Sequence, residues 1–256
     1  MAFFALDFDG VLCDSAEENA ASAWKCAHKL WPDLCKEDYV PKEVTQRFLE
    51  VRPYLEIGYQ AVLMIRMILE KQPLSAFRDE LSQHCQRLLQ KSELDRETMI
   101  HQFGASRDCW IRHDLKGWLQ SHRFYPGTLT ALQKALPCHA VVILTTKQER
   151  FVQLLLEGQG IVFPRENIWG LDRKIPKEQL LEQFLRQGKN EIYFVEDRLE
   201  TLERVCERAK LANVKLFYAL WGYGTEKERQ LVRNNPRLTC LELNSFNALL
   251  SNNNLV

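Results

Sequence analysis

The sequence predicts an α/β fold, with a three-layer parallel sheet as its core and an inserted all-helical domain. In the second half of the 256 residues, short apolar runs alternate with stretches whose apolar residues recur at helical spacing. One further apolar run stands alone near the N-terminus, at 3–8. Between these regions, residues 16–122 show helical spacing and no convincing strand. We therefore expect a core made of 1–15 and 123–256, and a helical insertion at 16–122.

Within the first strand, the apolar run Phe3–Leu6 leads into Asp7-Phe8-Asp9-Gly10. Because residues two apart on a strand point to the same side, Asp7 and Asp9 can address one substrate atom at the carboxyl end of the sheet, where open α/β folds bind ligands. Two such acids repel, and a Mg²⁺ ion held by Asp7 and Asp9 beside phosphate oxygens relieves the repulsion. The pair predicts Asp7 as a nucleophile that forms an aspartyl-phosphate, and Asp9 as first the acid and then the base. The alternatives are an ordinary strand-terminating turn or part of a calcium loop, although no further Asp or Asn follows at calcium-loop spacing.

The insertion contains the longest apolar run of the chain, at 61–69. Arg66 interrupts this run, which is too short to span a bilayer and so predicts a buried helix. A polar and aromatic group precedes it, and Arg52 in that group could clamp a substrate anion. The alternative is that Arg52-Pro53 marks a helix boundary with a solvent-facing arginine.

Beyond the insertion, strands and helices alternate. This alternation predicts a parallel sheet that is covered on both faces and is joined by the strand at 3–8. Strands are expected near 140–145, 167–170, 191–195, 214–220 and 238–243, and helices near 148–158, 177–187, 199–210 and 225–233.

The composition is typical of a soluble globular protein, with 46% hydrophobic and 27% charged residues. Thirty-four basic and 34 acidic residues cancel, so no overall field recruits nucleic acid or an anionic membrane. The eight cysteines are scattered without a CxxC pair, which indicates reduced thiols in a cytoplasmic protein. The N-terminal apolar run lacks a basic leader and a cleavage site, so we do not expect a signal peptide. The composition makes no prediction of oligomeric state.

Together with Asp14-Ser15, the segment Asp7–Val11 resembles the first motif of the haloacid dehalogenase superfamily of phosphohydrolases and phosphotransferases. The resemblance implies a Rossmann-like core, and it implies that the insertion is a helical cap that excludes water and selects the leaving group. Two further segments are similar to phosphoglycolate-phosphatase-like members: Phe124-Tyr125-Pro126-Gly127 and Leu220-Trp221-Gly222-Tyr223-Gly224.

The second motif of the superfamily is an apolar strand ending in Ser or Thr. Here Ala140–Leu144 leads into Thr145-Thr146-Lys147, and Thr145 matches the motif. The resemblance implies that its hydroxyl and the backbone N–H groups beside it, with Thr146 as a substrate contact, hold a transferring phosphoryl oxygen. A buried strand followed by a Thr cap describes the same residues.

The third motif is a lysine near a helix start, which balances the charge of the nucleophile and the phosphate. Two lysines fit. Lys177 fits the form in which the lysine opens the helix, and Lys174 fits the form in which it lies several residues earlier. We favour Lys177, because Pro176 is a good first-turn residue and places the next side chain at the helix mouth. One of the two is expected to be a solvated surface lysine.

The fourth motif is an apolar strand ending in acids that hold the metal, and Ile192–Val195 leads into Glu196-Asp197. Asp197 is the expected ligand. The superfamily usually has Gly-Asp and another Asp four residues later, whereas this chain has Glu196 and Thr201 at those positions. Glu196 or Glu200 could supply the second acid, and adjacent acids at a strand end could also be exposed turn residues.

These motifs predict a Mg²⁺-dependent phosphatase that acts on a small phosphorylated metabolite through an aspartyl-phosphate. Two alternatives stay open. A cap that excludes water could instead pass the phosphoryl group to a sugar hydroxyl, as in a phosphosugar mutase. The unusual fourth motif could also belong to a catalytically weak binding or regulatory protein that keeps the fold.

Overall fold

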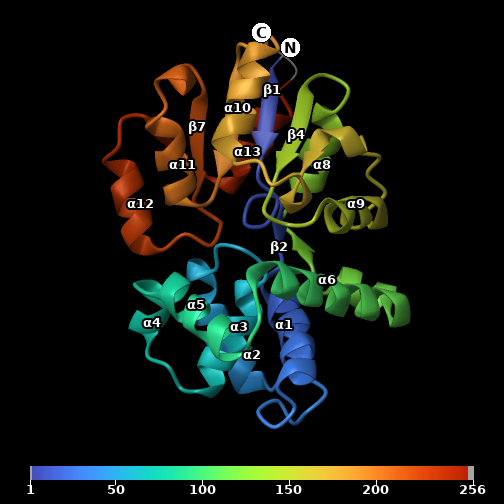
Figure 1. The fold of residues 1–256 in the computed structure, drawn as a ribbon. Coiled ribbons are helices and arrows are strands. Elements are labelled where there is room, and N and C mark those ends of the chain that lie inside the picture. Colours follow the sequence, from blue (N-terminus) through green and yellow to red (C-terminus); the bar gives the residue numbers. More distant parts are fainter. Residues whose placement is uncertain (1, 253–256) are drawn as a thin grey trace. The chain divides into compact units, whose positions relative to one another are not determined.

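The computed structural model describes residues 2–252, and its contacts divide the chain into two compact units. The first unit consists of Met1–Asp14 and Arg123–Val256, and the second is Ser15–His122. The chain therefore first passes from one unit to the other after Asp14, whereas the sequence predicted this boundary after residue 15. The first unit contains the sheet, and the second contains only helices and turns (Figure 1).

Six strands form the sheet of the first unit, and every neighbouring pair is parallel. Their order is β5-β4-β1-β6-β7-β8, so the N-terminal strand lies in the middle. The α/β prediction with a parallel sheet is thereby confirmed. The strands are β1 (Phe3–Leu6), β4 (Ala140–Leu144), β5 (Ile168–Trp169), β6 (Ile192–Glu196), β7 (Lys215–Ala219) and β8 (Leu238–Leu241).

Helices cover the sheet on both faces, which explains why all four residues of β1 are buried. Phe3 and Ala5 belong to an apolar cluster with residues of α10, α11 and α12. The alternate residue Phe4 points to the opposite face and is fully buried there. Helices α8 and α13 contact each other behind the sheet in the view of Figure 1. The helices of this unit are α8 (Thr128–Ala135), α9 (Glu149–Gly158), α10 (Lys177–Arg186), α11 (Leu199–Cys206), α12 (Glu226–Arg233) and α13 (Leu243–Leu250).

Three local features differ from the sequence expectations. The helix expected at 199–210 ends at Cys206, and a separate 3-10 turn follows at Ala209–Leu211. Helix α13 was not predicted. A two-stranded antiparallel ribbon of β2 (Cys13–Asp14) and β3 (Arg123–Phe124) was not predicted either, because two residues are too few to show an alternating pattern. The ribbon pairs the two points at which the chain leaves and re-enters the first unit.

The second unit is built around α3, whose residues from 60 to 67 are all buried. Its elements are α1 (Ala16–Leu30), α2 (Lys42–Val51), the 3-10 turn η1 (Arg52–Tyr54), α3 (Gln60–Leu69), α4 (Leu74–Arg78), α5 (Leu81–Lys91), α6 (Arg96–His113) and α7 (Leu115–Gln120).

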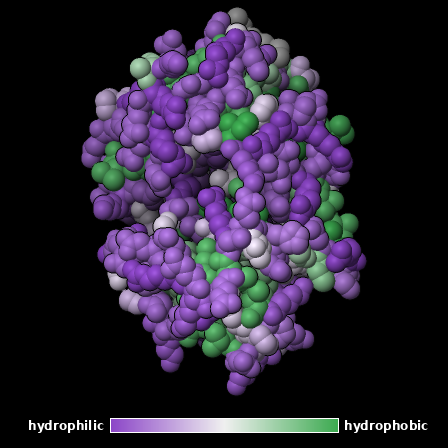
Figure 2. Space-filling model, viewed as in Figure 1, coloured by the Kyte–Doolittle hydropathy of each residue, from purple (hydrophilic) through white to green (hydrophobic). Residues whose placement is uncertain are grey.

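Among residues 2–252, no helix is both long and apolar enough to cross a membrane. Hydrophilic residues predominate on the face drawn in Figure 2, and hydrophobic ones gather there in smaller groups.

A charged group lies inside this helical unit. The fully buried Glu18 accepts hydrogen bonds from Arg107 Nε at 2.7 Å and Nη2 at 2.8 Å. His122 Nε2 lies 3.6 Å from the same carboxylate, and its Nδ1 contacts the backbone oxygen of Trp118 at 2.9 Å. The bidentate contact compensates the loss of hydration of both charges. The contact connects α1 with α6, and His122, the last residue of this unit, lies beside the same carboxylate.

Candidate active site

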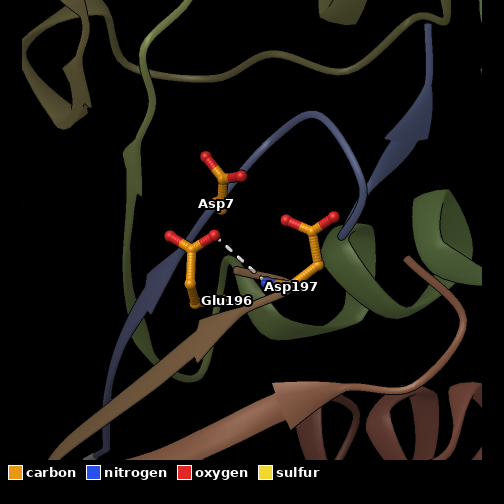
Figure 3. A group of neighbouring side chains, drawn as sticks. All are labelled: Asp7, Glu196 and Asp197. Carbon is orange, nitrogen blue, oxygen red and sulfur yellow. Dashed lines mark hydrogen bonds between the residues drawn. The ribbon is translucent and has the colours of Figure 1, made fainter. Parts of the chain in front are cut away.

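Three carboxylates converge where the central strands end. Asp7 directly follows β1, Glu196 is the last residue of β6, and Asp197 follows it. Because β1 and β6 are parallel neighbours, both strands deliver their ends to the same edge of the sheet. The side chains point the same way, and one oxygen from each lies within 4.8 Å of the others (Figure 3). All three residues are buried, with exposed fractions of 6%, 0% and 1%.

Lys177 connects two of these acids. Its Nζ lies 2.7 Å from Asp7 Oδ1 and 2.7 Å from Glu196 Oε2. Lys177 is the first residue of α10, and Pro176 before it has an extended backbone (φ −60°, ψ 145°). The helix therefore begins at Lys177, whose side chain extends from this end of α10 to the acids at the sheet edge.

The pKa values show how these groups influence one another. Burial raises the pKa of Asp7 from an ordinary 3.8 to about 7, and Lys177 opposes this rise while Glu196 and Asp9 add to it. Burial alone would lower the pKa of Lys177, but the carboxylates of Asp7 and Glu196 raise it instead. The lysine therefore stays charged, because both carboxylates contact it. A divalent cation would lower the pKa of Asp7 again, because it stabilises the ionised carboxylate.

The backbone around the site fixes both acids of the fourth motif. Glu196 Oε1 accepts the N–H groups of Asp197 and Arg198, each at 3.1 Å. Asp197 Oδ2 accepts the N–H of Tyr223 at 2.8 Å. Gly10, in the left-handed region at φ 92°, lies so close that a Cβ there would be 2.1 Å from Asp197 Oδ2. Any side chain at position 10 would therefore displace the carboxylate, which explains the glycine after the two aspartates.

Asp9 lies two residues after Asp7, in the loop that follows β1. Its carboxylate receives Lys147 Nζ at 3.0 Å to Oδ1 and 3.2 Å to Oδ2. The sequence interpretation gave Lys147 no role, although it ends the Thr145-Thr146-Lys147 stretch. A lysine after a strand is common on protein surfaces, and only the pairing of β4 with β1 brings this one beside Asp9.

The two threonines of the second motif differ in exposure. Thr145 is buried, its N–H donates to the backbone oxygen of Trp169 at 3.0 Å, and its hydroxyl accepts the N–H of Lys147 at 3.1 Å. Thr146 is exposed. Thr145 thus follows β4 at the same edge of the sheet as Asp7, because β4 and β1 are parallel neighbours.

The other sequence candidates in the sheet unit differ from Lys177 and Glu196 in exposure or in their contacts. Lys174 is exposed and left-handed (φ 54°) at the end of a 3-10 turn, so the ion pairs with Asp7 favour Lys177 as the motif lysine. Glu200 is exposed and pairs with Arg204 at 2.7 Å, whereas Glu196 belongs to the carboxylate group. Thr201 is buried and accepts a hydrogen bond from Arg204 at 3.2 Å.

Arg52 lies in the other unit, as the first residue of η1. Only 8% of its surface is exposed, and its backbone oxygen accepts the N–H of Leu55 at 3.1 Å. It does mark a helix boundary, at the end of α2, but it is not the solvent-facing arginine of the alternative interpretation.

The donor set fits a divalent cation. Asp7, Glu196 and Asp197 offer three carboxylates, and one ammonium, that of Lys177, lies among them. Hard cations such as Mg²⁺ and Ca²⁺ prefer carboxylate oxygens, and a cation would offset the remaining negative charge. These three residues could therefore hold a divalent metal ion.

Comparisons with known proteins were made at the level of sequence and of structure. No family model matches the chain, and no curated protein matches its sequence. Solved structures match over nearly the whole chain. A predicted phosphatase from Clostridium acetobutylicum covers 97% of each chain at 16% identity, with a TM-score of 0.59. A predicted phosphoglycolate phosphatase from Haemophilus somnus also covers 97% of each chain, at 15% identity and a TM-score of 0.59.

A third solved structure carries the superfamily name. This haloacid dehalogenase-like hydrolase from Streptococcus pneumoniae is 15% identical, with a TM-score of 0.54, over 97% of this chain and 98% of its own. Identities this low relate folds rather than activities. The parallel sheet, the insertion after its first strand and these matches agree with the resemblance of the sequence motifs. The chain therefore has the fold of the haloacid dehalogenase-like phosphatases and hydrolases.

Proposed function

We propose that this protein is a Mg²⁺-dependent phosphatase that hydrolyses the phosphate ester of a small metabolite. One observation carries the proposal: Lys177 Nζ lies 2.7 Å from both Asp7 and Glu196, at the carboxyl end of the two central strands. A lysine that only stabilises the fold needs a single carboxylate partner. A lysine that serves two acids, with Asp197 as a third beside them, instead suits a site that must accept a phosphoryl group and a cation.

The residues suggest a reaction in two steps. In the first, Asp7 forms a bond to phosphorus while the ester P–O bond breaks, and Asp9 donates a proton to the departing oxygen. In the second, water attacks phosphorus, Asp9 accepts its proton, and the bond to Asp7 breaks to release inorganic phosphate. Lys177 offsets negative charge next to Asp7, and the hydroxyl of Thr145 is available to a phosphoryl oxygen. A bound Mg²⁺ ion would supply positive charge that lets two anions approach.

The inserted helical unit is proposed to act as the cap that excludes water and selects the leaving group. Arg52 is its candidate anion contact, and the exposed Thr146 is the candidate contact from the sheet unit. The similarity to a predicted phosphoglycolate phosphatase supports a small phosphorylated organic acid as one substrate to test. No observation favours transfer to a sugar hydroxyl over transfer to water.

Hydrolysis of p-nitrophenyl phosphate with and without Mg²⁺ tests the proposal. The wild type should turn over the ester with Mg²⁺ and stop with EDTA, and Asp7→Asn should abolish turnover while the circular dichroism spectrum stays the same. Asp33→Asn makes the same chemical change at an exposed position of the other unit and should keep full activity. Turnover by Asp7→Asn at the wild-type rate would overturn the proposal. So would a wild type that hydrolyses neither this ester nor any of a panel of phosphorylated metabolites.

A further inference from the structure

The second lysine of the site, Lys147, has no part in the mechanism above. Its side chain is only 2% exposed, yet it carries a charge that is costly to bury without a partner. Its ammonium contacts both oxygens of Asp9, at 3.0 and 3.2 Å. Asp9 keeps 19% of its side chain exposed, so one end of the pair is buried and the other is accessible. The buried lysine therefore holds an accessible carboxylate in place.

The backbone of Lys147 is fixed at both ends. Its N–H donates to Thr145 Oγ1 at 3.1 Å, and its carbonyl oxygen accepts the N–H of Leu171 at 3.1 Å. The next turn is tied to the same neighbouring segment, because Glu149 accepts a hydrogen bond from Arg173 Nε at 2.6 Å. The ammonium of Lys147 thus projects from a braced loop, which limits the positions that Asp9 can adopt while it is paired.

The two lysines of the site have separate partners. Lys177 contacts Asp7 and Glu196, while Lys147 contacts Asp9. If Asp7 is the nucleophile, Lys177 serves bond formation to phosphorus. Lys147 then acts on the residue that transfers protons.

We propose that Lys147 is a positioning residue that holds the Asp9 carboxylate where it can exchange a proton with the leaving oxygen and with water. This inference rests on the proposed function. If Lys147 positions Asp9, its loss should slow esters with poor leaving groups more than aryl esters. A poor leaving group needs a well-placed acid, whereas the leaving group of an aryl ester departs without one.

The experiment compares Lys147→Met with the wild type on two esters, glycerol phosphate and p-nitrophenyl phosphate. Loss of the ammonium should lower kcat/KM for glycerol phosphate at least about tenfold more than kcat/KM for the aryl ester, because kcat/KM reports the step in which the leaving oxygen departs. Lys147→Arg keeps the charge and should recover part of the lost rate. Lys134→Met removes an exposed lysine from the same unit and should leave both rates unchanged.

A double variant tests whether Lys147 acts through Asp9. In the Asp9→Asn background, adding Lys147→Met should cost no further activity on either ester, because the residue to be positioned has already been removed. If the rate losses of the two single variants instead multiply in the double variant, the inference is overturned and Lys147 contacts the phosphoryl group directly. A raised KM with unchanged kcat in Lys147→Met would lead to the same conclusion. Equal losses on both esters in the single variant, with no rescue by arginine, would also overturn it in favour of a purely structural ion pair.

Folding and function are separated by two further readouts. The thermal unfolding midpoint of each variant shows whether a loss of rate reflects a loss of folded protein, and the double variant avoids leaving a lone buried charge. If the wild type is active and Asp7→Asn is not, but Lys147→Met equals the wild type on both esters, this inference fails alone. If the wild type is inactive on all esters, it is the proposed function that fails.

Discussion

The ammonium of Lys177 lies 2.7 Å from the carboxylate of Asp7, although the whole helical insertion and a large part of the sheet unit separate the two residues in the sequence. One stands at the start of α10 and the other just beyond β1, the strand in the middle of the sheet. The contact therefore depends on the order of the strands. It also favours Lys177 over Lys174, the other lysine that the sequence offers for the third motif.

Replacing Lys177 should remove most of the activity. Lys177→Met should lower kcat by about 100-fold or more, because the charge beside the nucleophile and the phosphoryl group is lost. Lys174→Met makes the same change three residues earlier, at an exposed position, and should keep a kcat close to that of the wild type. Steady-state rates with p-nitrophenyl phosphate measure both, and a larger loss in Lys174→Met would reverse the assignment of the two lysines.

The metal requirement should depend on both acids at the end of β6. Asp197→Asn and Glu196→Gln should each raise the Mg²⁺ concentration needed for half-maximal activity, because an amide oxygen attracts a hard cation less than a carboxylate does. Glu200→Gln and Thr201→Ala are controls, since Glu200 is exposed and paired with Arg204. Magnesium titrations of the four variants make the comparison. An unchanged titration for Asp197→Asn would remove the fourth motif from the site and favour a binding protein that keeps the fold.

The stability of the metal-free protein should depend on pH through Asp7. Burial raises its folded pKa from 3.8 to about 7, so between these values the native state holds a proton that the unfolded chain has released. The free energy of unfolding should then fall as pH rises from 4 to 7, by at most about 4 kcal/mol at 1.36 kcal/mol per pKa unit. Urea unfolding in EDTA at pH 5 and 8 measures the fall, and Asp7→Asn should reduce it. If the free energy of unfolding of Asp7→Asn has the same pH dependence as that of the wild type, Asp7 ionises in the folded protein as it does in the unfolded chain.

The buried charges of the helical unit predict a large loss of stability on truncation. Arg107→Met leaves the fully buried Glu18 without its bidentate partner and should lower the free energy of unfolding by about 3–5 kcal/mol. Arg87→Met removes an exposed arginine from α5 and should leave the unfolding midpoint nearly unchanged. Chemical denaturation measures the free energy of unfolding of both variants. Equal denaturation midpoints for Arg107→Met and Arg87→Met would show that Glu18 finds other partners.

The sequence predicts the acids better than it predicts their partners. Apolar runs precede Asp7, Asp9 and Asp197. An apolar run followed by an acid can be recognised from a few neighbouring residues in the sequence. The role of Lys147 leaves no such pattern, because its contact with Asp9 exists only once β4 lies beside β1.

The unpredicted elements have similar physical causes. Helix α13 is short and mostly apolar, so its eight residues show little contrast between two faces. The ribbon of β2 and β3 consists of two residues on each side, and its strands are brought together by the fold around them rather than by their own sequence. Long apolar strands with polar ends are the features that a single sequence reveals well.

The central place of β1 also bears on how the protein is made. Phe3 pairs with Ala140 on one side and with Ile192 on the other, so β1 leaves the ribosome well before its two partner strands, which are synthesised much later. The helical unit, whose contacts are closer in sequence, can form during that interval. Until residue 192 emerges, an apolar strand with an unpaired edge stays open to wrong neighbours. Slow refolding and a dependence on chaperones during synthesis are therefore expected consequences of placing β1 before the helical insertion and in the middle of the sheet.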